Sequence, residues 1–398
     1  MSRRRAAFFF GSGISFASGM PSVTQITDAA LNENWHLNTN QIFVPGLNQN
    51  PGLDDDVTPR VLQFLKEVRI CAEDYLSELS RDGTVRAPHY EDLFSLVEQA
   101  SRTDRDTIPN LAVVEFQRRL KASTEELYTG FESSVTGGEG FSGLAETTCE
   151  FLHWVVHHSL SAKIQNPQGL SLISETARAV EELDIFTLNH DRLVETQIRN
   201  DGIKNIDDGF NDLDHGEFRV FGGWKQEGRE KVVRLFKLHG SLDWYLYEFP
   251  GWARQYAVPT GQDAFHSHNE RGHLVRPVEW KAAFLSGTVV KEQRYGLGFW
   301  GALIHAFRER LGEHNRLICC GYGFGDVGIN QRLQQWANDL PGENQLVILS
   351  PDSPEKYLTG KPPWLSELYE RRQITFVPHY LEDCEIEDLK PYFEQTLS

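Results

Sequence analysis

Cysteine is scarce in this chain of 398 residues, and its spacing is not that of a metal site. The five cysteines form no Cys-x-x-Cys pair, which is the spacing that a zinc module requires. An odd number of cysteines without such spacing is typical of reduced, mostly buried thiols. We therefore expect a cytoplasmic protein that holds no metal.

Long apolar runs and basic residues are also in short supply. No apolar run approaches the roughly 18–20 residues of a membrane helix, so we expect no membrane contact. The arginines at positions 3–5 precede an apolar stretch that ends after Phe10, too short for an export signal. The chain has 39 lysines and arginines against 57 aspartates and glutamates, a net charge of −18. Because contacts to phosphates need clustered basic residues, we expect no direct binding of nucleic acid by this chain.

The most informative segment lies near the start, where apolar residues 7–10 lead into Gly11-Ser12-Gly13-Ile14-Ser15. Glycines directly after a strand let the backbone approach a ligand closely. The amides at the start of the following helix then face an anion such as a pyrophosphate. Gly-Ser-Gly also occurs in ordinary turns. The motif therefore indicates a ligand site only in combination with the motifs that follow later in the sequence.

The periodicity of the chain changes near residue 183. Before it, helical spacing begins at Thr58-Pro59, an N-cap followed by proline, and continues around 90–100, 111–131, 144–161 and 170–183. After it, short apolar runs of strand length alternate with helical patterns at 299–311 and 329–339. These runs lie at 184–188, 232–238, 316–321, 345–350 and 373–377.

Buried strands that alternate with helices predict an α/β fold. We expect a Rossmann-like parallel sheet with helices on both faces and a large helical insertion after the first strand. Residues 1–21 and 183–398 would form the sheet domain, and residues 22–182 the mostly helical insertion. We expect residues 243–290, which are rich in Trp, Tyr, Pro and Gly, to be irregular and to cover the site.

Polar or glycine-rich clusters follow the ends of the predicted strands, where open α/β sheets bind ligands. Besides Gly11–Ser15, they are Asn189-His190-Asp191, His239-Gly240-Ser241, Gly321–Asp326 and, more weakly, Ser350-Pro351-Asp352. Each has a purely structural interpretation, such as a helix cap, a hydrogen-bonded strand end or a turn. Together they supply glycines for phosphates, an Asn and an Asp for a ribose or an amide, and a histidine that can move a proton near neutral pH.

These motifs resemble those of the sirtuins and occur in the same order. They are Gly-x-Gly-x-Ser from Gly11, Ser-Gly-x-Pro from Ser18, Thr-x-Asn-x-Asp from Thr187, and His-Gly at His239. The sequence Gly-Tyr-Gly-Phe-Gly-Asp at 321–326 is similar to that of the sirtuin-like proteins of bacterial antiphage defence. The resemblance implies a Rossmann-like site with NAD as the substrate.

The sequence departs from the lysine deacylases among the sirtuins. It has no four-cysteine zinc module, and Ser22-Val23-Thr24 replaces the usual Asp-Phe-Arg. Leu188 and His190 stand where deacylases usually carry Gln and Ile. We therefore expect NAD hydrolysis that gives ADP-ribose and nicotinamide. A protein deacylase or ADP-ribosyltransferase remains an alternative, as does a non-catalytic sensor of NAD or ADP-ribose.

The resemblance also implies roles for individual residues. Asn189 would orient the attacking water and the ribose, Asp191 would hold the nicotinamide amide, and His239 would act as the general base. The residues expected along the pyrophosphate are Gly11, Ser12, Gly13, Ser15 and Ser18. Those expected at the adenosine half are Gly321, Gly323, Phe324, Ser350 and Asp352. The preference between NAD and NADP stays open, because no strand-end acid is clearly placed for the adenosine ribose.

An NAD hydrolase that is always active would kill its host, so we expect its activity to be gated. The sequence has no evident sensor domain and no P-loop, which leaves self-assembly or a separately encoded partner. The chain is similar in layout to the sirtuin-like subunit that assembles with a hexameric ATPase of the HerA family. We expect a homo-oligomer, with residues 58–182 as the assembly surface.

Overall fold

The computed structural model describes residues 3–46, 56–79, 86–103, 111–161, 166–211, 216–224, 231–249, 253–261, 263–288, 290–340 and 342–396. The chain divides into two compact units. The sheet unit comprises Met1–Met20, Lys163–Leu285 and Arg294–Ser398. The helical unit comprises Pro21–Ala162 and Ser286–Gln293.

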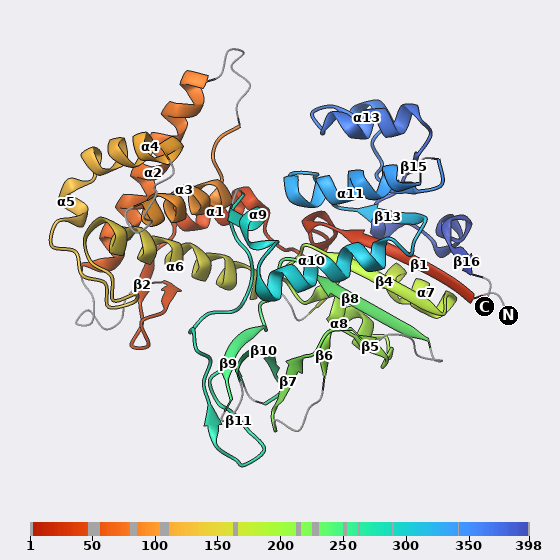
Figure 1. Cartoon of the computed structure of the whole chain (residues 1–398), viewed down its shortest axis with the longest axis horizontal. Coiled ribbons are helices and arrows are strands. Elements are labelled where there is room, and N and C mark those ends of the chain that lie inside the picture. Colours follow the sequence, from red (N-terminus) through yellow and green to blue (C-terminus); the bar gives the residue numbers. More distant parts are fainter. Residues whose placement is uncertain are drawn as a thin grey trace. The chain divides into compact units, whose positions relative to one another are not determined.

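Seven parallel strands form the main sheet in the described part of the sheet unit (Figure 1). Their order is β15-β14-β13-β1-β4-β8-β5, and β16 pairs antiparallel with the start of β1. The strands are β1 (Arg3–Phe10), β4 (Glu182–Thr187), β5 (Ile206–Asp207), β8 (Val232–Lys237), β13 (Arg316–Cys320), β14 (Gln345–Leu349), β15 (Ile374–Val377) and β16 (Glu394–Thr396). The predicted Rossmann-like parallel sheet is confirmed.

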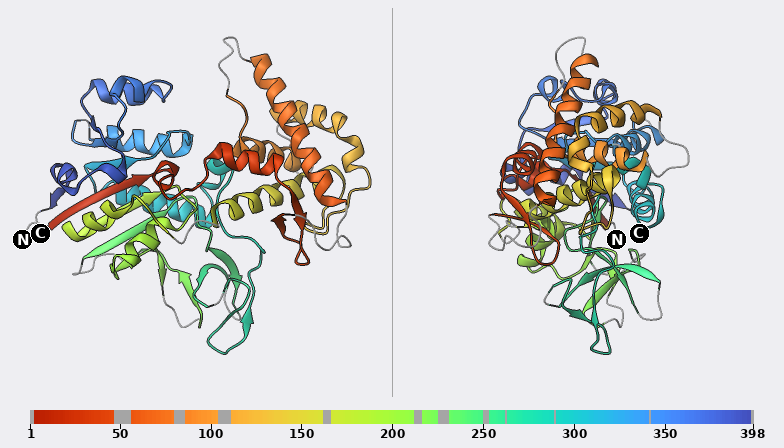
Figure 2. Two further views of the ribbon diagram at one scale, coloured as in Figure 1. Left: turned by 180° about the vertical axis from the view of Figure 1, so that it is seen from behind. Right: turned by 90° about the vertical axis from the view of Figure 1, so that its left-hand side faces the viewer.

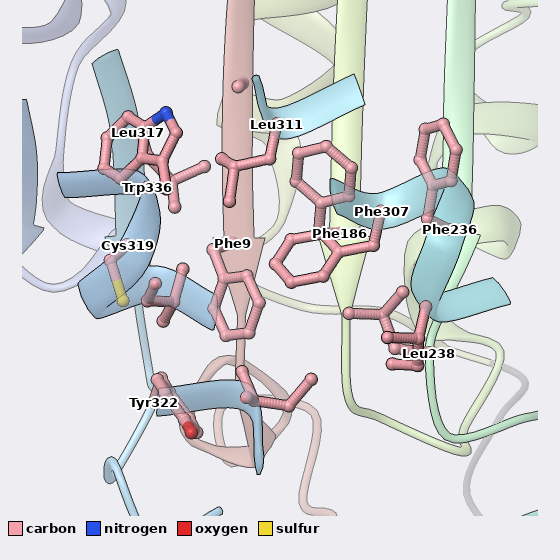
Figure 3. Packing of buried hydrophobic residues seen from close by; sticks show 14 of the residues in the cluster. Phe9, Phe186, Phe236, Leu238, Phe307, Leu311, Leu317, Cys319, Tyr322 and Trp336 are labelled. Atoms are coloured by element: carbon pink, nitrogen blue, oxygen red, sulfur yellow. The ribbon is translucent and has the colours of Figure 1, made fainter. Parts of the chain in front are cut away.

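Strand β1 lies at the centre of this sheet, and both of its faces are covered. In Figure 2 (left) the red strand runs between the blue elements and the yellow-green ones. Phe8, Phe9 and Phe10 are fully buried, and successive side chains of a strand point to opposite faces. Phe9 packs near Phe307 of α10 on one face, with Phe186 beside it (Figure 3). This explains why the strand has a continuous apolar sequence rather than an alternating one.

Helices flank the sheet on both sides (Figure 1). Apolar side chains of α10, α11 and α13 join the buried cluster over β13, β1, β4 and β8. Helices α7 and α8 lie on the opposite side in Figure 1. The helices and short turns of the unit are η1 (Ser12–Ser15), α7 (Ser171–Ala179), α8 (Leu193–Asn200), α10 (Gly298–Leu311), α11 (Val327–Asp339), α12 (Pro354–Leu358), α13 (Pro363–Glu370), η2 (Leu381–Asp383), α14 (Ile386–Leu389) and η3 (Lys390–Tyr392).

A second, antiparallel sheet occupies part of the region that we expected to be irregular. Its order is β6-β7-β10-β9, with β6 (Phe210–Asn211), β7 (Phe218–Phe221), β9 (Tyr245–Glu248) and β10 (Arg254–Pro259). A short hairpin of β11 (Ser267–His268) and β12 (Leu274–Val275) follows. The expectation for 243–290 is therefore wrong in part. Tyr245 and Tyr247 are buried and Glu248 is exposed, the alternation typical of a strand with one covered face.

The helical unit packs its long helices around α6. Its elements are α1 (Val23–Asn32), β2 (Trp35–Leu37), β3 (Phe43–Pro45), α2 (Val57–Leu79), α3 (Tyr90–Thr103), α4 (Leu111–Ser123), α5 (Glu125–Tyr128), α6 (Gly140–Ser161) and α9 (Val290–Arg294), whose last residue belongs to the sheet unit. The helix expected over 111–131 is interrupted at Thr124, whose hydroxyl donates to the Leu120 carbonyl at 2.6 Å. No helix in the described part of the chain is both long and apolar enough to cross a membrane.

The units are divided at places that the sequence pattern did not indicate. Helix α7 belongs to the sheet unit, although its sequence continues the helical run. Conversely, Ser286–Gln293 belongs to the helical unit, where Lys291 Nζ lies 2.7 Å from Glu91 Oε1 of α3. Lys291 is buried, and a buried ammonium requires such a partner.

A network of buried charges joins the amino ends of the central strands. Asp184 of β4 is fully buried and accepts from Arg310 Nε at 2.6 Å and His314 Nε2 at 2.7 Å. His314 Nδ1 lies 3.4 Å from Glu394 of β16. Burial alone would lower the pKa of His314, but its hydrogen bond to Asp184 and the nearby Glu394 carboxylate raise it above the ordinary value. The network thus favours a protonated His314.

The raised pKa of His314 makes stability depend on pH. The protonated form is favoured in the fold, so its contribution is complete below the ordinary histidine pKa of about 6.5 and is lost as the pH rises through the folded-state pKa. Each pKa unit corresponds to about 1.4 kcal/mol. We expect His314→Gln to remove this loss between about pH 6 and about pH 9, measured as the free energy of unfolding in urea. His305→Gln, at an exposed position of α10, is the control and should keep the parent's slope. An unchanged slope in His314→Gln would contradict the assignment.

Candidate functional site

The register of the parallel strands brings the predicted clusters to one edge of the sheet. Phe10 of β1 pairs with Thr187 of β4 and with Cys320 of β13, so these strands end level. Lys237 of β8 pairs with Thr187, and Leu349 of β14 with Cys320. The loops that follow start at Gly11, Leu188, Leu238, Gly321 and Ser350. From β1, the chain first adds β4 and β8 on one side and later adds β13, β14 and β15 on the other. The carboxyl end of β1 is therefore a topological switch point of the sheet.

The loops after β1 and β13 are in direct backbone contact. A Cβ atom on Gly11 would lie 2.6 Å from the Gly321 oxygen, and one on Gly321 would lie 2.5 Å from the Ile14 nitrogen. The Gly13 amide donates to the Gly321 oxygen at 2.9 Å. The close approach of the two loops thus explains why glycine is required at these positions, without any ligand. The role of Gly11 and Gly13 along a pyrophosphate stays a prediction.

Ser15, Asn189 and Asp191 form one buried hydrogen-bonded cluster, and each is no more than 7 % exposed. Asn189 Nδ2 donates to Ser15 Oγ at 3.1 Å, and Ser15 Oγ donates to Asp191 Oδ2 at 2.9 Å. The Leu193 amide donates to Asp191 Oδ1 at 3.0 Å, so Asp191 also supports the start of α8. The cluster joins residues that are 174 and 176 positions apart.

A buried ion pair next to this cluster supports the backbone of Asp191. Lys237 Nζ lies 2.8 Å from Glu195 Oε1 and also donates to the backbone oxygen of Asp191. Both side chains are buried, and burial raises the pKa of the Glu195 carboxyl. The pair ties β8 and α8 to the loop that carries Asn189 and Asp191. The sequence did not indicate it, because Lys237 lies inside an apolar run.

His239, at the end of β8, contacts two side chains that the sequence analysis did not connect with it. Its Nε2 lies 2.5 Å from the Tyr295 hydroxyl and 3.2 Å from Asp326 Oδ2. The Tyr295 hydroxyl donates to Asp326 Oδ2 at 2.7 Å. The expected cap is also present, since Asp326 Oδ1 accepts from the Ile329 amide at 2.8 Å. His190, on the loop after β4, has its ring centroid 6.2 Å from that of His239.

In the loop after β13 the Phe324 ring is buried, whereas Gly323 and Gly325 on either side of it are exposed. The Phe324 ring is buried against Tyr322 and Trp364, with centroids 4.6 and 5.9 Å away. Its backbone has a φ of 58°, a left-handed conformation that is uncommon outside glycine. A Cβ atom on Gly323 would meet no atom within 4 Å. The backbone of this loop is therefore open to the approach of a ligand at Gly323.

Three predicted residues are engaged elsewhere. Ser18 Oγ donates to the Gln168 oxygen at 3.2 Å and accepts from the Gln168 amide at 2.8 Å. Ser350 Oγ accepts from the Asp352 amide at 3.3 Å, and Asp352 pairs with Lys356 of α12. Ser12 is exposed. Among the residues that the structure describes, no group of three or more His, Cys, Asp or Glu side chains could hold a metal ion.

The contact between the two glycine loops predicts a large difference between two neighbouring glycines. Gly321 has a φ of 65°, so Gly321→Ala adds backbone strain to the overlap with Ile14. We expect it to lower the free energy of unfolding by about 2–4 kcal/mol. Gly325→Ala is the control, because a Cβ atom there would meet nothing within 4 Å. Equal stability of the two variants in urea unfolding would show that the loops can separate without cost.

Comparison with known families agrees with this geometry. Residues 184–376 match the family model of the SIR2-like domain, which is a little under half of the chain. The matched segment runs from β4 to β15 and includes Asn189, Asp191, His239 and the loop from Gly321. No curated protein matches the chain. This part of the chain is therefore similar to the SIR2-like domain, a family that uses NAD as a substrate.

Proposed function

We propose that this protein hydrolyses the bond between nicotinamide and ribose in NAD. The observation that carries the proposal is the convergence of the loops after β1, β4 and β8. They bring Ser15, Asn189 and Asp191 into one cluster and place His239 on the neighbouring loop. A site at the switch point of an open sheet suits a dinucleotide. The SIR2-like match covers the loops that carry Asn189, Asp191 and His239.

The reaction requires a site that stabilises positive charge and positions water. As the bond breaks, its electron pair goes to the pyridinium ring, and neutral nicotinamide leaves. Positive charge develops on the ribose, as in the oxocarbenium-like transition state of glycoside hydrolysis. Water then forms the new bond to the ribose carbon and loses a proton. The products are nicotinamide and ADP-ribose.

Asn189 and Asp191 suit the first part of this reaction. The hydrogen bond from Asn189 Nδ2 to Ser15 fixes the plane of the amide, whose oxygen then serves as the acceptor that orients a water or a ribose hydroxyl. Asp191 is held by two donors, the Ser15 hydroxyl and the Leu193 amide. A carboxylate fixed in this way favours a cation that develops beside it, at no cost of reorganisation. His239 takes the proton from the water or from a ribose hydroxyl.

We further propose that the activity is gated and serves antiphage defence by depleting cellular NAD. The support is the resemblance of the sequence to sirtuin-like defence proteins. The activity would be controlled either by assembly of the chain into a homo-oligomer or by a separately encoded HerA-family ATPase. Activity should therefore be measured on the chain alone and with the product of a neighbouring gene.

Asn189→Ala should abolish NAD consumption while the fold stays intact, because it removes the amide that orients the nucleophile. Chromatographic detection of nicotinamide and ADP-ribose from purified protein measures this. Asn200→Ala, at the exposed end of α8, is the matched control and should behave as the parent. Undiminished turnover by Asn189→Ala would refute its assigned role. Release of nicotinamide that requires an acyl-lysine peptide would instead identify a deacylase.

His239→Ala should lower the rate of NAD consumption by about 10²–10⁴-fold, the usual contribution of a positioned general base. Binding of NAD, measured by calorimetry under conditions without turnover, should change much less. His305→Ala, at an exposed position of α10, serves as the control for loss of a histidine. A His239→Ala protein that binds and cleaves NAD at the parent's rate would exclude His239 as the base. Binding without turnover in the parent itself, even with a partner, would favour a sensor.

A further inference from the structure

The environment of His239 decides which of its two ring nitrogens carries a proton. Nε2 faces the Tyr295 hydroxyl at 2.5 Å and Asp326 Oδ2 at 3.2 Å. The Tyr295 ring also stacks on the imidazole, at 5.9 Å and an angle of 21°. His239 and Tyr295 are both buried. These contacts hold the imidazole at its Nε2 edge.

The proton on Tyr295 is fixed by its surroundings. Burial raises the pKa of the Tyr295 phenol well above its ordinary value, and the Asp326 carboxylate raises it further. The phenol therefore stays neutral and has one hydrogen to donate. That hydrogen goes to Asp326 Oδ2, at 2.7 Å. Asp326 is the N-cap of α11, and the helix dipole favours a carboxylate there, which can only accept.

The proton on the histidine follows from this arrangement. Because the phenol donates to Asp326, its oxygen faces His239 as an acceptor. Asp326 Oδ2 is the second acceptor near the same nitrogen. Both contacts are satisfied only if Nε2 carries a hydrogen. In the neutral imidazole the other nitrogen, Nδ1, is then the basic atom.

We propose that Tyr295 and Asp326 are positioning residues that hold the His239 proton on Nε2 and make Nδ1 the atom that accepts a proton. The inference rests on the proposed function, because the proton in question is released in NAD hydrolysis. Neither residue is assigned contact with NAD. The arrangement parallels the use of a buried carboxylate to orient a catalytic histidine in other hydrolases. Here a tyrosine hydroxyl contacts both the carboxylate and the imidazole.

Other titratable or charged groups near this arrangement come from two elements. His190, on the loop after β4, has its ring 6.2 Å from that of His239. Arg332 of α11 lies over the Tyr295 ring, with Cζ 5.3 Å from the centroid. Asp326 is the carboxylate in contact with the imidazole. Its charge favours the imidazolium form, so its removal should make His239 a weaker base.

Two variants test the proposal without removing His239. Asp326→Asn keeps a side chain that caps α11, since Asn and Asp are equally good N-caps, but it removes the carboxylate. Tyr295→Phe keeps the stacked ring and removes the hydroxyl. Tyr247→Phe is the matched control, because Tyr247 is also buried and its hydroxyl donates to the Ala264 oxygen at 2.9 Å, away from His239.

The first measurement needs no turnover. In protein labelled with ¹⁵N-histidine, NMR reports which nitrogen of each imidazole is protonated, and the signals of His239 are assigned by their loss in His239→Gln. We expect Nε2–H in the parent and in Tyr247→Phe. In Asp326→Asn a substantial Nδ1–H population should appear, with a smaller one in Tyr295→Phe. An Nδ1–H form in the parent, or no change in either variant, would overturn the proposal.

The second measurement is the pH profile of NAD hydrolysis. We expect kcat to fall by about 10–10³-fold in Asp326→Asn and less in Tyr295→Phe, with KM nearly unchanged. The acidic limb should move to lower pH in Asp326→Asn, because the base loses the charge that favours its protonated form. Faster hydrolysis by Tyr295→Phe would overturn the proposal and show that the hydroxyl blocks His239. A parent that never consumes NAD refutes the proposed function, whereas the NMR result then still decides the hydrogen-bond assignment.

Discussion

The backbone contact between the loops after β1 and β13 is the constraint on which the site depends. Gly11, Gly13 and Gly321 allow the two loops to approach within distances that no Cβ atom would permit. The contact fixes the turn η1, and with it Ser15, which then bridges Asn189 and Asp191. Without it, the polar residues after β4 would lack their partner from β1. The glycines therefore position a serine of the proposed site.

Buried charges stabilise both ends of the central strands, but they do so for different purposes. At the amino ends, Asp184 joins Arg310 and His314 and ties α10 and β16 to β4. At the carboxyl ends, Lys237 and Glu195 hold the backbone that presents Asp191. Removing Lys237 from the second group would leave the buried Glu195 without its cationic partner, which costs several kcal/mol. Only the second group lies next to the residues of the proposed reaction.

The local pattern of the sequence was sufficient for most of the main sheet. Continuous apolar runs such as 316–321 and 345–350 predicted buried parallel strands, and β13 and β14 occupy them. It failed for 243–290, where the alternation of β9 covers only four residues amid turns. It also missed the break at Thr124, because a threonine in a helical pattern does not by itself show whether its hydroxyl bonds to the preceding turn.

The sequence by itself determined that Asn189, Asp191 and His239 follow strand ends, and parallel pairing is enough to bring such ends to one edge. The tertiary structure alone decided their partners. Tyr295 is 56 residues from His239 and precedes α10 in a segment without a distinctive motif. Its contact exists because α10 and α11 pack on the same face of the sheet. Spacing along a strand is a local property of the backbone, whereas the meeting of two side chains depends on how distant elements pack.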